Sequence, residues 1–248
     1  MKPILTLITG LLIASAASAQ SIAPKADAAL KSMGQLLAGA KAMTFKSHST
    51  VDTWSSTGQK VQVARSQQIS VRRPDGLAAT VTGDDLNLKF TYDGKQVLLV
   101  NTDKQSYALA DAKPTIDATL DMLATEYGLP IPLADILYAD PYKTLIENVR
   151  SGEHLGTGYV MDTKCDHLAF RQDNIDWQVW IEQGDKPLPR KLVITYRDAP
   201  GQPQYTAYFS DWNLSADIPA EQFKAQVPQD LKRVDLVKST QPKPDAKE

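Results

Sequence analysis

Apolar and polar residues alternate with a period of two along most of the chain, which predicts antiparallel β-strands. A first set is expected at 51–54, 60–73, 77–82, 86–92, 97–101 and 106–110. A second set is expected at 155–161, 164–172, 175–183, 191–197 and 205–211. Ser55-Ser56-Thr57-Gly58 and Asp93-Gly94 are turn sequences typical of hairpins. Neighbouring strands are therefore expected to pair locally.

Other stretches have the period of a helix. Apolar residues recur on one helical face over 26–37, before Gly39, and again over 116–127, before Gly128. Glycine is common just beyond a helix end, so both helices are expected to stop there. Shorter helices are expected over 133–138 and 142–149. A helical insertion of about 40 residues would then separate the two sets of strands.

The period of two also assigns the faces of the sheet. Trp177, Val179 and Ile181 share one face of their strand, whereas Trp180 shares the other with polar neighbours. Later strands repeat the pattern, so the sheet has one continuous apolar face. Such a sheet must curve and be covered, and imperfect cover leaves a cavity. The expected fold class is mainly β with helices: a curved antiparallel half-barrel covered by an N-terminal helix and a central helical insertion.

The N-terminus has the pattern of a cleavable signal peptide over residues 1–19. A polar start precedes an apolar stretch, which ends in Ala17-Ser18-Ala19. The apolar stretch is too short to span a membrane, and no cysteine follows the cleavage site to carry a lipid anchor. We therefore expect an exported protein with a single domain over 20–237 and a disordered polar tail over 238–248.

The charge and cysteine content bear on which partners and cofactors the protein can have. The formal net charge is −2, and no basic patch favours a nucleic acid or a strongly anionic membrane as partner. The only cysteine, Cys165, has no partner in the chain for a disulfide. No phosphate-binding glycine motif is present, and no cofactor is expected.

Cys165 and His167 are the best candidates for catalysis, because they lie two apart on a strand and face the same side. A nucleophile also needs an oriented base and an oxyanion site, and no motif supplies them, so we interpret Cys165 as a buried core thiol. His48 and His154 lie on other strands, which leaves no zinc ligand set. The paired acids Asp84-Asp85 and Asp173 with Asp176 lie in expected turns, where carboxylates cap the backbone. The sequence predicts neither an enzyme nor a metal site.

Three segments carry a resemblance to a known superfamily. The run Val71-Arg72-Arg73-Pro74-Asp75-Gly76-Leu77, then Tyr92-Asp93-Gly94-Lys95, and finally Phe223 to Gln229, resemble in sequence and order the landmarks of the LolA/LolB-like periplasmic lipoprotein carriers. The block Cys165 to Tyr196, with Tyr205 to Trp212, resembles a related family of predicted periplasmic proteins of unknown function. The resemblance covers nearly the whole of 20–237.

This resemblance implies a periplasmic binding or carrier protein for an acyl chain, a lipid or a lipoprotein. It also implies that Arg73 holds a helical lid by hydrogen bonds, and that Leu77 is the next apolar landmark of the motif. The helical stretch 115–149 is longer than a minimal carrier requires. The residues expected to line the cavity are Leu88, Phe90, Leu99, Trp177, Val179 and Ile194.

The sequence leaves two main alternatives to a lipid or lipoprotein carrier. An envelope sensor or scaffold would hold a protein partner without lipid cargo, with a filled core and an exposed apolar patch on the Trp180 face. A thiol-dependent enzyme would need an accessible, acidic Cys165 beside His167. A sugar-stacking role for Trp54, Trp177, Trp180 and Trp212 is a minor option, because tryptophans on sheets mostly pack.

Overall fold

The computed structural model describes residues 21–129, 131 and 133–239. The expected signal peptide lies outside the described residues, and so do residues 240–248 of the expected tail. The start of that tail contacts the second helix, because Lys238 Nζ lies 3.3 Å from Glu126 Oε2 and the Ser239 N–H donates to the Glu126 carbonyl. Within the described ranges, no helix is both long and apolar enough to cross a membrane.

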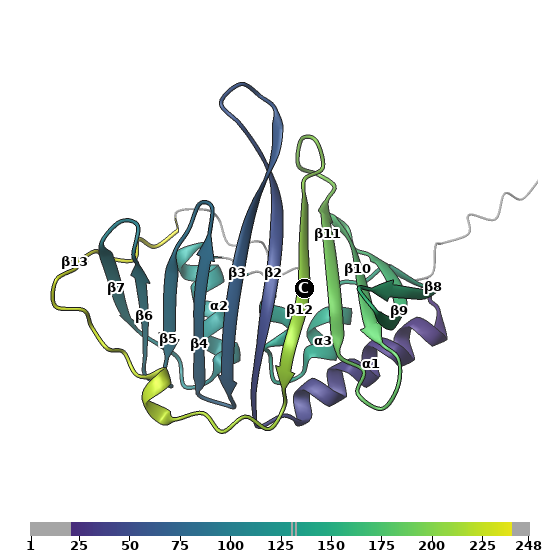
Figure 1. Ribbon diagram of the computed structural model, residues 1–248, viewed down its shortest axis with the longest axis horizontal. Helices are drawn as coiled ribbons and strands as arrows, with labels where there is room; N and C mark the ends of the chain where they lie inside the picture. The colour runs from purple at the N-terminus through teal and green to yellow at the C-terminus, as the bar shows by residue number, and fades with distance from the viewer. Residues whose placement is uncertain (1–20, 130, 132, 240–248) are drawn as a thin grey trace, which may run out of the picture.

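One curved sheet of 13 strands forms the body of the described chain (Figure 1). Its order is β1-β8-β9-β10-β11-β12-β2-β3-β4-β5-β6-β7-β13. The strands are β1 Ser21–Ile22, β2 Ala42–Trp54, β3 Lys60–Arg72, β4 Gly76–Gly83, β5 Leu88–Tyr92, β6 Gln96–Asn101, β7 Ser106–Asp111, β8 Ser151–Val160, β9 Thr163–Arg171, β10 Ile175–Glu182, β11 Pro189–Tyr196, β12 Gln204–Asn213 and β13 Lys232–Arg233. Among these described strands, only the short outermost β1 and β13 pair in parallel with their neighbours.

Local pairing is confirmed, since every antiparallel pair except β12 with β2 joins consecutive strands. The β12–β2 pair links the two sets of strands across the middle of the sheet. β2 begins at Ala42, well before the expected start at residue 51. That extension was missed because its inward positions include Ser47 and Ser49, which are buried but not apolar. β8 likewise begins at Ser151, earlier than expected.

The helices are α1 Pro24–Gly39, α2 Ile116–Tyr127 and α3 Pro141–Ile146, with the 3₁₀-helices η1 Ala134–Ile136 and η2 Ala220–Phe223. In Figure 1 α2 and α3 lie behind the sheet, whereas η2 lies at its lower left edge, near β4 and β5. Thr115 Oγ1 caps α2 by accepting from the Ala118 N–H at 3.2 Å, and Gly128 ends it with a φ of 62°. Both longer helices match the sequence expectation. α3 ends at Ile146, earlier than the expected residue 149, and η1 is a single turn.

The core lies between the helices and the inner face of the sheet. Trp177, Val179 and Ile181 are buried there with the apolar face of α1, as the period of two predicted. At the other end of the sheet η2 buries Phe223 completely, and the Arg72 guanidinium lies 4.7 Å from the centre of its ring. The fold class is therefore confirmed: a mainly β half-barrel with one face covered by helices.

Gly34 sets the separation of α1 and α3. A Cβ at this position would lie 2.6 Å from Tyr142 Cβ and 2.8 Å from its backbone N. Gly34→Ala is therefore expected to lower the free energy of unfolding by about 1–3 kcal/mol in urea titrations, because backbone must move. Gly39→Ala is the matched control, since a Cβ added at Gly39 would meet no other part of the protein within 4 Å. Alanine there should leave the free energy of unfolding unchanged or raise it by up to about 1 kcal/mol. Equal effects of the two substitutions would contradict the packing described.

Candidate ligand pocket beneath the helical insertion

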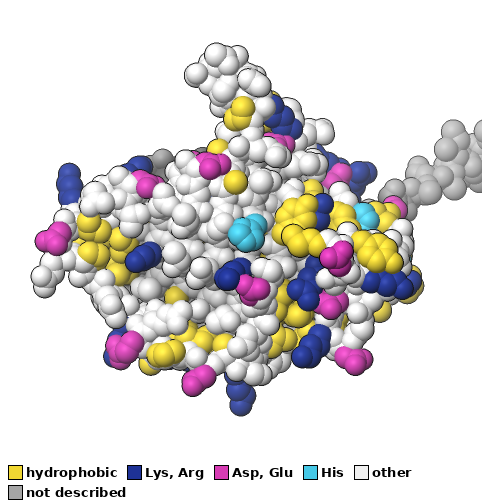
Figure 2. Space-filling model, in the orientation of Figure 1, with side chains coloured by type: hydrophobic (Ala, Val, Ile, Leu, Met, Phe, Trp, Pro, Cys, Tyr) yellow, Lys and Arg dark blue, Asp and Glu magenta, His cyan; other side chains and the backbone are white. Residues whose placement is uncertain are grey.

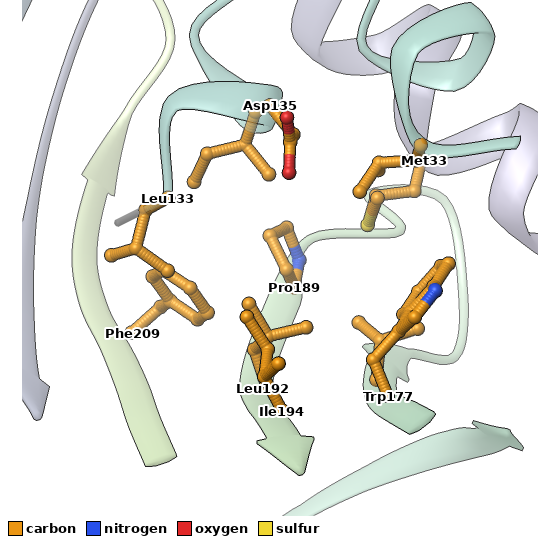
Figure 3. Close-up of a pocket in the computed structure, with 11 residues that line it drawn as sticks. Met33, Leu133, Asp135, Trp177, Pro189, Leu192, Ile194 and Phe209 are labelled. Atoms are coloured by element: carbon orange, nitrogen blue, oxygen red, sulfur yellow. The ribbon is translucent and has the colours of Figure 1, made fainter. Parts of the chain in front are cut away.

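An apolar pocket lies between the inner face of β10–β12 and the segment 133–146, which we call the cover segment (Figure 3). Its cavity volume is about 30 Å³, roughly the space that one water molecule occupies in the liquid. The lining side chains therefore nearly fill the pocket in this conformation. Its lining residues are Met33, Leu133, Asp135, Ile136, Leu145, Trp177, Val179, Pro189, Leu192, Ile194 and Phe209.

Three of the six expected lining residues meet in this pocket: Trp177, Val179 and Ile194. Phe90 and Leu99 belong to the same apolar core but lie on β5 and β6, away from this pocket, and Leu88 is half-buried at the start of β5. A role in ligand contact stays a prediction for all six.

Several lining residues were not singled out from sequence, although a signal existed for some. Leu192 and Phe209 share an apolar face with residues already noted on their strands, and Met33 lies on the apolar face of α1. No sequence pattern pointed to Asp135.

Arg73 connects the sheet to the cover segment. Its Nη1 donates to the Leu137 carbonyl at 2.6 Å, and its Nε and Nη2 are buried without a hydrogen-bond partner among the described residues. Burial lowers the pKa of Arg73, and the nearby Asp117 carboxylate partly offsets this effect. The guanidinium therefore connects the β3–β4 turn to the C-terminal end of η1 through a single hydrogen bond. Its burial costs free energy, because two of its three nitrogens have no hydrogen-bond partner among the described residues.

Two carboxylates on α2 hold the same part of the cover segment. Asp117 Oδ1 accepts from the Ala139 N–H at 3.0 Å, and the Tyr138 hydroxyl donates to Asp121 Oδ1 at 2.6 Å. Burial, followed by this hydrogen bond to Asp121, raises the pKa of Tyr138. Polar bonds thus attach residues 137–139 to Arg73 and α2, while Leu133 and Leu145 of the same segment line the pocket.

Cys165 and His167 have separate environments. Cys165 is fully buried, and burial, followed by the Glu182 carboxylate, raises the pKa of its thiol to about 11. His167 Nε2 hydrogen-bonds Gln178 Oε1 at 2.9 Å, and its ring stacks on Trp180 at 4.0 Å between centroids. This geometry leaves the thiol protonated and gives the imidazole a structural partner.

The raised pKa predicts an unreactive thiol. At pH 7.5 a thiol-specific reagent should label Cys165 at least ~100-fold more slowly in the folded protein than in the chain unfolded in urea, because both burial and a scarce thiolate oppose reaction. The time course of labelling, followed by mass spectrometry, measures this ratio. Comparable rates in the two states would restore the thiol-dependent enzyme as a candidate.

The other polar candidates are used in structural contacts. Asp84 Oδ2 accepts from the Ala64 N–H at 2.8 Å, and Asp85 pairs with Arg65. Asp173 and Asp176 form ion pairs with arginines of the neighbouring strand ends. In the part of the chain that the structure describes, no group of three or more metal-ligating side chains is present.

A row of side chains crosses the outer face of the sheet. His167, Trp180, Lys191, Tyr208 and His48 are successive register partners on β9, β10, β11, β12 and β2. Lys191 Nζ lies 4.6 Å from the Trp180 ring centre and 5.1 Å from that of Tyr208. Figure 2, which views this face, shows hydrophobic side chains gathered over the β8–β11 end. The strongly exposed apolar residues of that end are Leu155, Tyr159 and Met161.

Several solved structures align with most of this chain. An uncharacterized conserved protein from Thermus thermophilus aligns with a TM-score of 0.50 at 9% identity, over 85% of this chain and 99% of its own. The lipoprotein LppX from Mycobacterium tuberculosis aligns with a TM-score of 0.50 at 14% identity, over 79% and 99%. A LolA superfamily protein from Nitrosomonas europaea aligns with a TM-score of 0.36 at 10% identity, over 81% and 97%. At these identities the likeness to the Thermus and Mycobacterium proteins concerns the fold alone.

Sequence comparison places the chain in a family. No curated protein matches it significantly. A family model described as "Predicted periplasmic protein (DUF2092)" matches residues 26–237, which include every helix and strand described above except β1 and the first two residues of α1. The chain therefore belongs to the DUF2092 family of predicted periplasmic proteins.

Proposed function

We propose that this protein binds an apolar ligand, an acyl chain of a lipid or lipoprotein, in the pocket beneath the cover segment, and carries it through the periplasm. The observation that carries the proposal is the lining. Ten of the eleven lining residues are apolar or aromatic, and they join a rigid sheet to a separately attached cover. Ligand pockets in proteins have this composition.

Because the cavity holds only about 30 Å³, the cover segment would have to move before an acyl chain enters. Arg73 ties the exit of η1 to the sheet by a side-chain bond, so its single hydrogen bond to Leu137 is the natural latch. Gly128 and Leu133, with φ of 62° and 69°, flank the start of the cover segment and supply a hinge. A non-glycine residue at positive φ is uncommon and carries a backbone cost, which fits a position where the chain changes conformation.

The test is mass spectrometry of organic extracts from the protein purified out of its native periplasm, with the Arg73→Leu variant in parallel. Stoichiometric lipid or acylated peptide, altered in amount in the variant, is the expected result. Empty extracts from both proteins, together with no uptake of added acyl chains, would contradict the proposal.

The outer face favours a second candidate function, an envelope sensor or scaffold that binds a protein partner. The exposed Tyr159 and Met161 lie at the same end of the sheet as the Trp180 row. Exposed apolar patches of this kind mark contact sites. Periplasmic crosslinking should then yield a partner that Trp180→Ala loses and Arg73→Leu retains. The reverse dependence would assign the partner to the pocket.

A further inference from the structure

We propose that Asp135 makes the pocket selective for amphiphiles whose polar end is neutral or cationic and carries a hydrogen-bond donor, and that it disfavours anionic chains such as free fatty acids. This inference rests on the proposed ligand-binding function. It specifies the chemistry that the polar end of the ligand must have.

The position of Asp135 is the first observation. It lies on η1, and its carboxylate points into the pocket from the cover segment (Figure 3). Among the described residues of the lining it is the only charged one, and they include no lysine, arginine or histidine. A second negative charge beside it would be repelled, and the described lining holds no cation to offset the repulsion.

The environment of this carboxylate points the same way. Asp135 is an exposed residue overall, but the pocket that it lines is otherwise made of apolar and aromatic side chains. Burial alone raises its pKa, and no cation among the described residues stabilises the ionised form. A ligand that donates a hydrogen bond or carries a positive charge would supply the partner that the protein does not.

Trp177 is the second, independent observation. Its side chain is 3% exposed and lines the pocket, and its indole Nε1 has no hydrogen-bond partner among the described residues. A buried donor without a partner costs free energy, so an acceptor atom on the ligand would also be favoured. In Figure 3 the indole nitrogen lies on the edge of the ring away from Asp135, so the selection between donor-bearing and anionic polar ends rests on the carboxylate.

The experiment compares three probes with the same chain length: dodecylamine, 1-dodecanol and dodecanoate. Each displaces the neutral fluorophore N-phenyl-1-naphthylamine from the full-length mature protein at pH 8, below its micelle concentration. We expect dodecylamine and dodecanol to bind at least ~10-fold more tightly than dodecanoate. In Asp135→Asn, which keeps the shape of the side chain, the difference should shrink to within ~3-fold, chiefly because dodecanoate binds more tightly.

Asp198→Asn is the matched control, since Asp198 is an exposed turn residue and the substitution changes the net charge by the same amount. It should keep the wild-type order of the three probes. Equal binding of dodecanoate in the wild type, or an unchanged order in Asp135→Asn, would overturn the role of Asp135 while ligand binding itself stood. If both variants lost the selectivity among the three probes, net charge would explain that selectivity, and the inference would be overturned. Displacement by none of the probes would overturn the binding function as well.

Discussion

Replacing Trp177 with alanine should lower the free energy of unfolding by about 3–5 kcal/mol. The side chain is 3% exposed, stacks on Phe170 with ring centroids 4.2 Å apart, and both lines the pocket and belongs to the core. Truncation removes a large buried apolar surface and leaves a void that the surrounding strands cannot fill. Urea titration followed by circular dichroism measures the change.

Trp180→Ala is the control for this prediction, because Trp180 lies three residues along the same strand on the opposite face. It packs between His167 and Lys191 on the outer surface, so its loss should cost about 1 kcal/mol. A loss of stability as large as that of Trp177→Ala would show that the outer row, rather than the covered face, holds the sheet together.

Replacing Arg73 with leucine should release the cover segment while leaving most of the fold intact. A hydrogen bond from a charged donor contributes about 1.5–3 kcal/mol, so amide exchange within 133–146 should accelerate by about tenfold or more. The melting temperature should change little, because removing a buried guanidinium also removes its desolvation cost. Hydrogen exchange followed by mass spectrometry resolves the cover segment from β2–β7.

Arg72→Leu is the matched variant for the latch. Arg72 precedes Arg73 in the chain but pairs with Asp75 and lies against Phe223, so its loss should affect η2 rather than the cover segment. Unchanged exchange of 133–146 in Arg73→Leu, or equal acceleration in Arg72→Leu, would remove Arg73 from the latch role.

The architecture follows from the sequence because its signals are local. The alternation around Trp177 and the helical spacing over 116–127 depend only on neighbouring residues, and both survive in the fold. The first half of β2 escaped prediction because Ser47 and Ser49 face inward. Small polar residues can fill a crowded position in a curved sheet without adding to an apolar pattern.

The pocket could be predicted only in part. Its extent depends on where the cover segment packs on the apolar face of the sheet and on the space that remains beneath it. Phe90 and Trp177 have the same alternating signal, but only Trp177 lies beneath the cover segment. Asp135 carried no signal at all, because an acid in a short helical turn is ordinarily solvated. Its orientation into the pocket arises from the path of the chain between Leu133 and α3.

The central claim, that an apolar chain enters the pocket beneath the cover segment, is tested most directly by photocrosslinking. A twelve-carbon alcohol with a diazirine near the chain end would be irradiated with the mature protein, and the modified residues mapped by peptide mass spectrometry. The account predicts labels on the lining, at Leu133, Leu145, Trp177 and Leu192. Labels confined to the outer face around Tyr159 and Trp180 would contradict it.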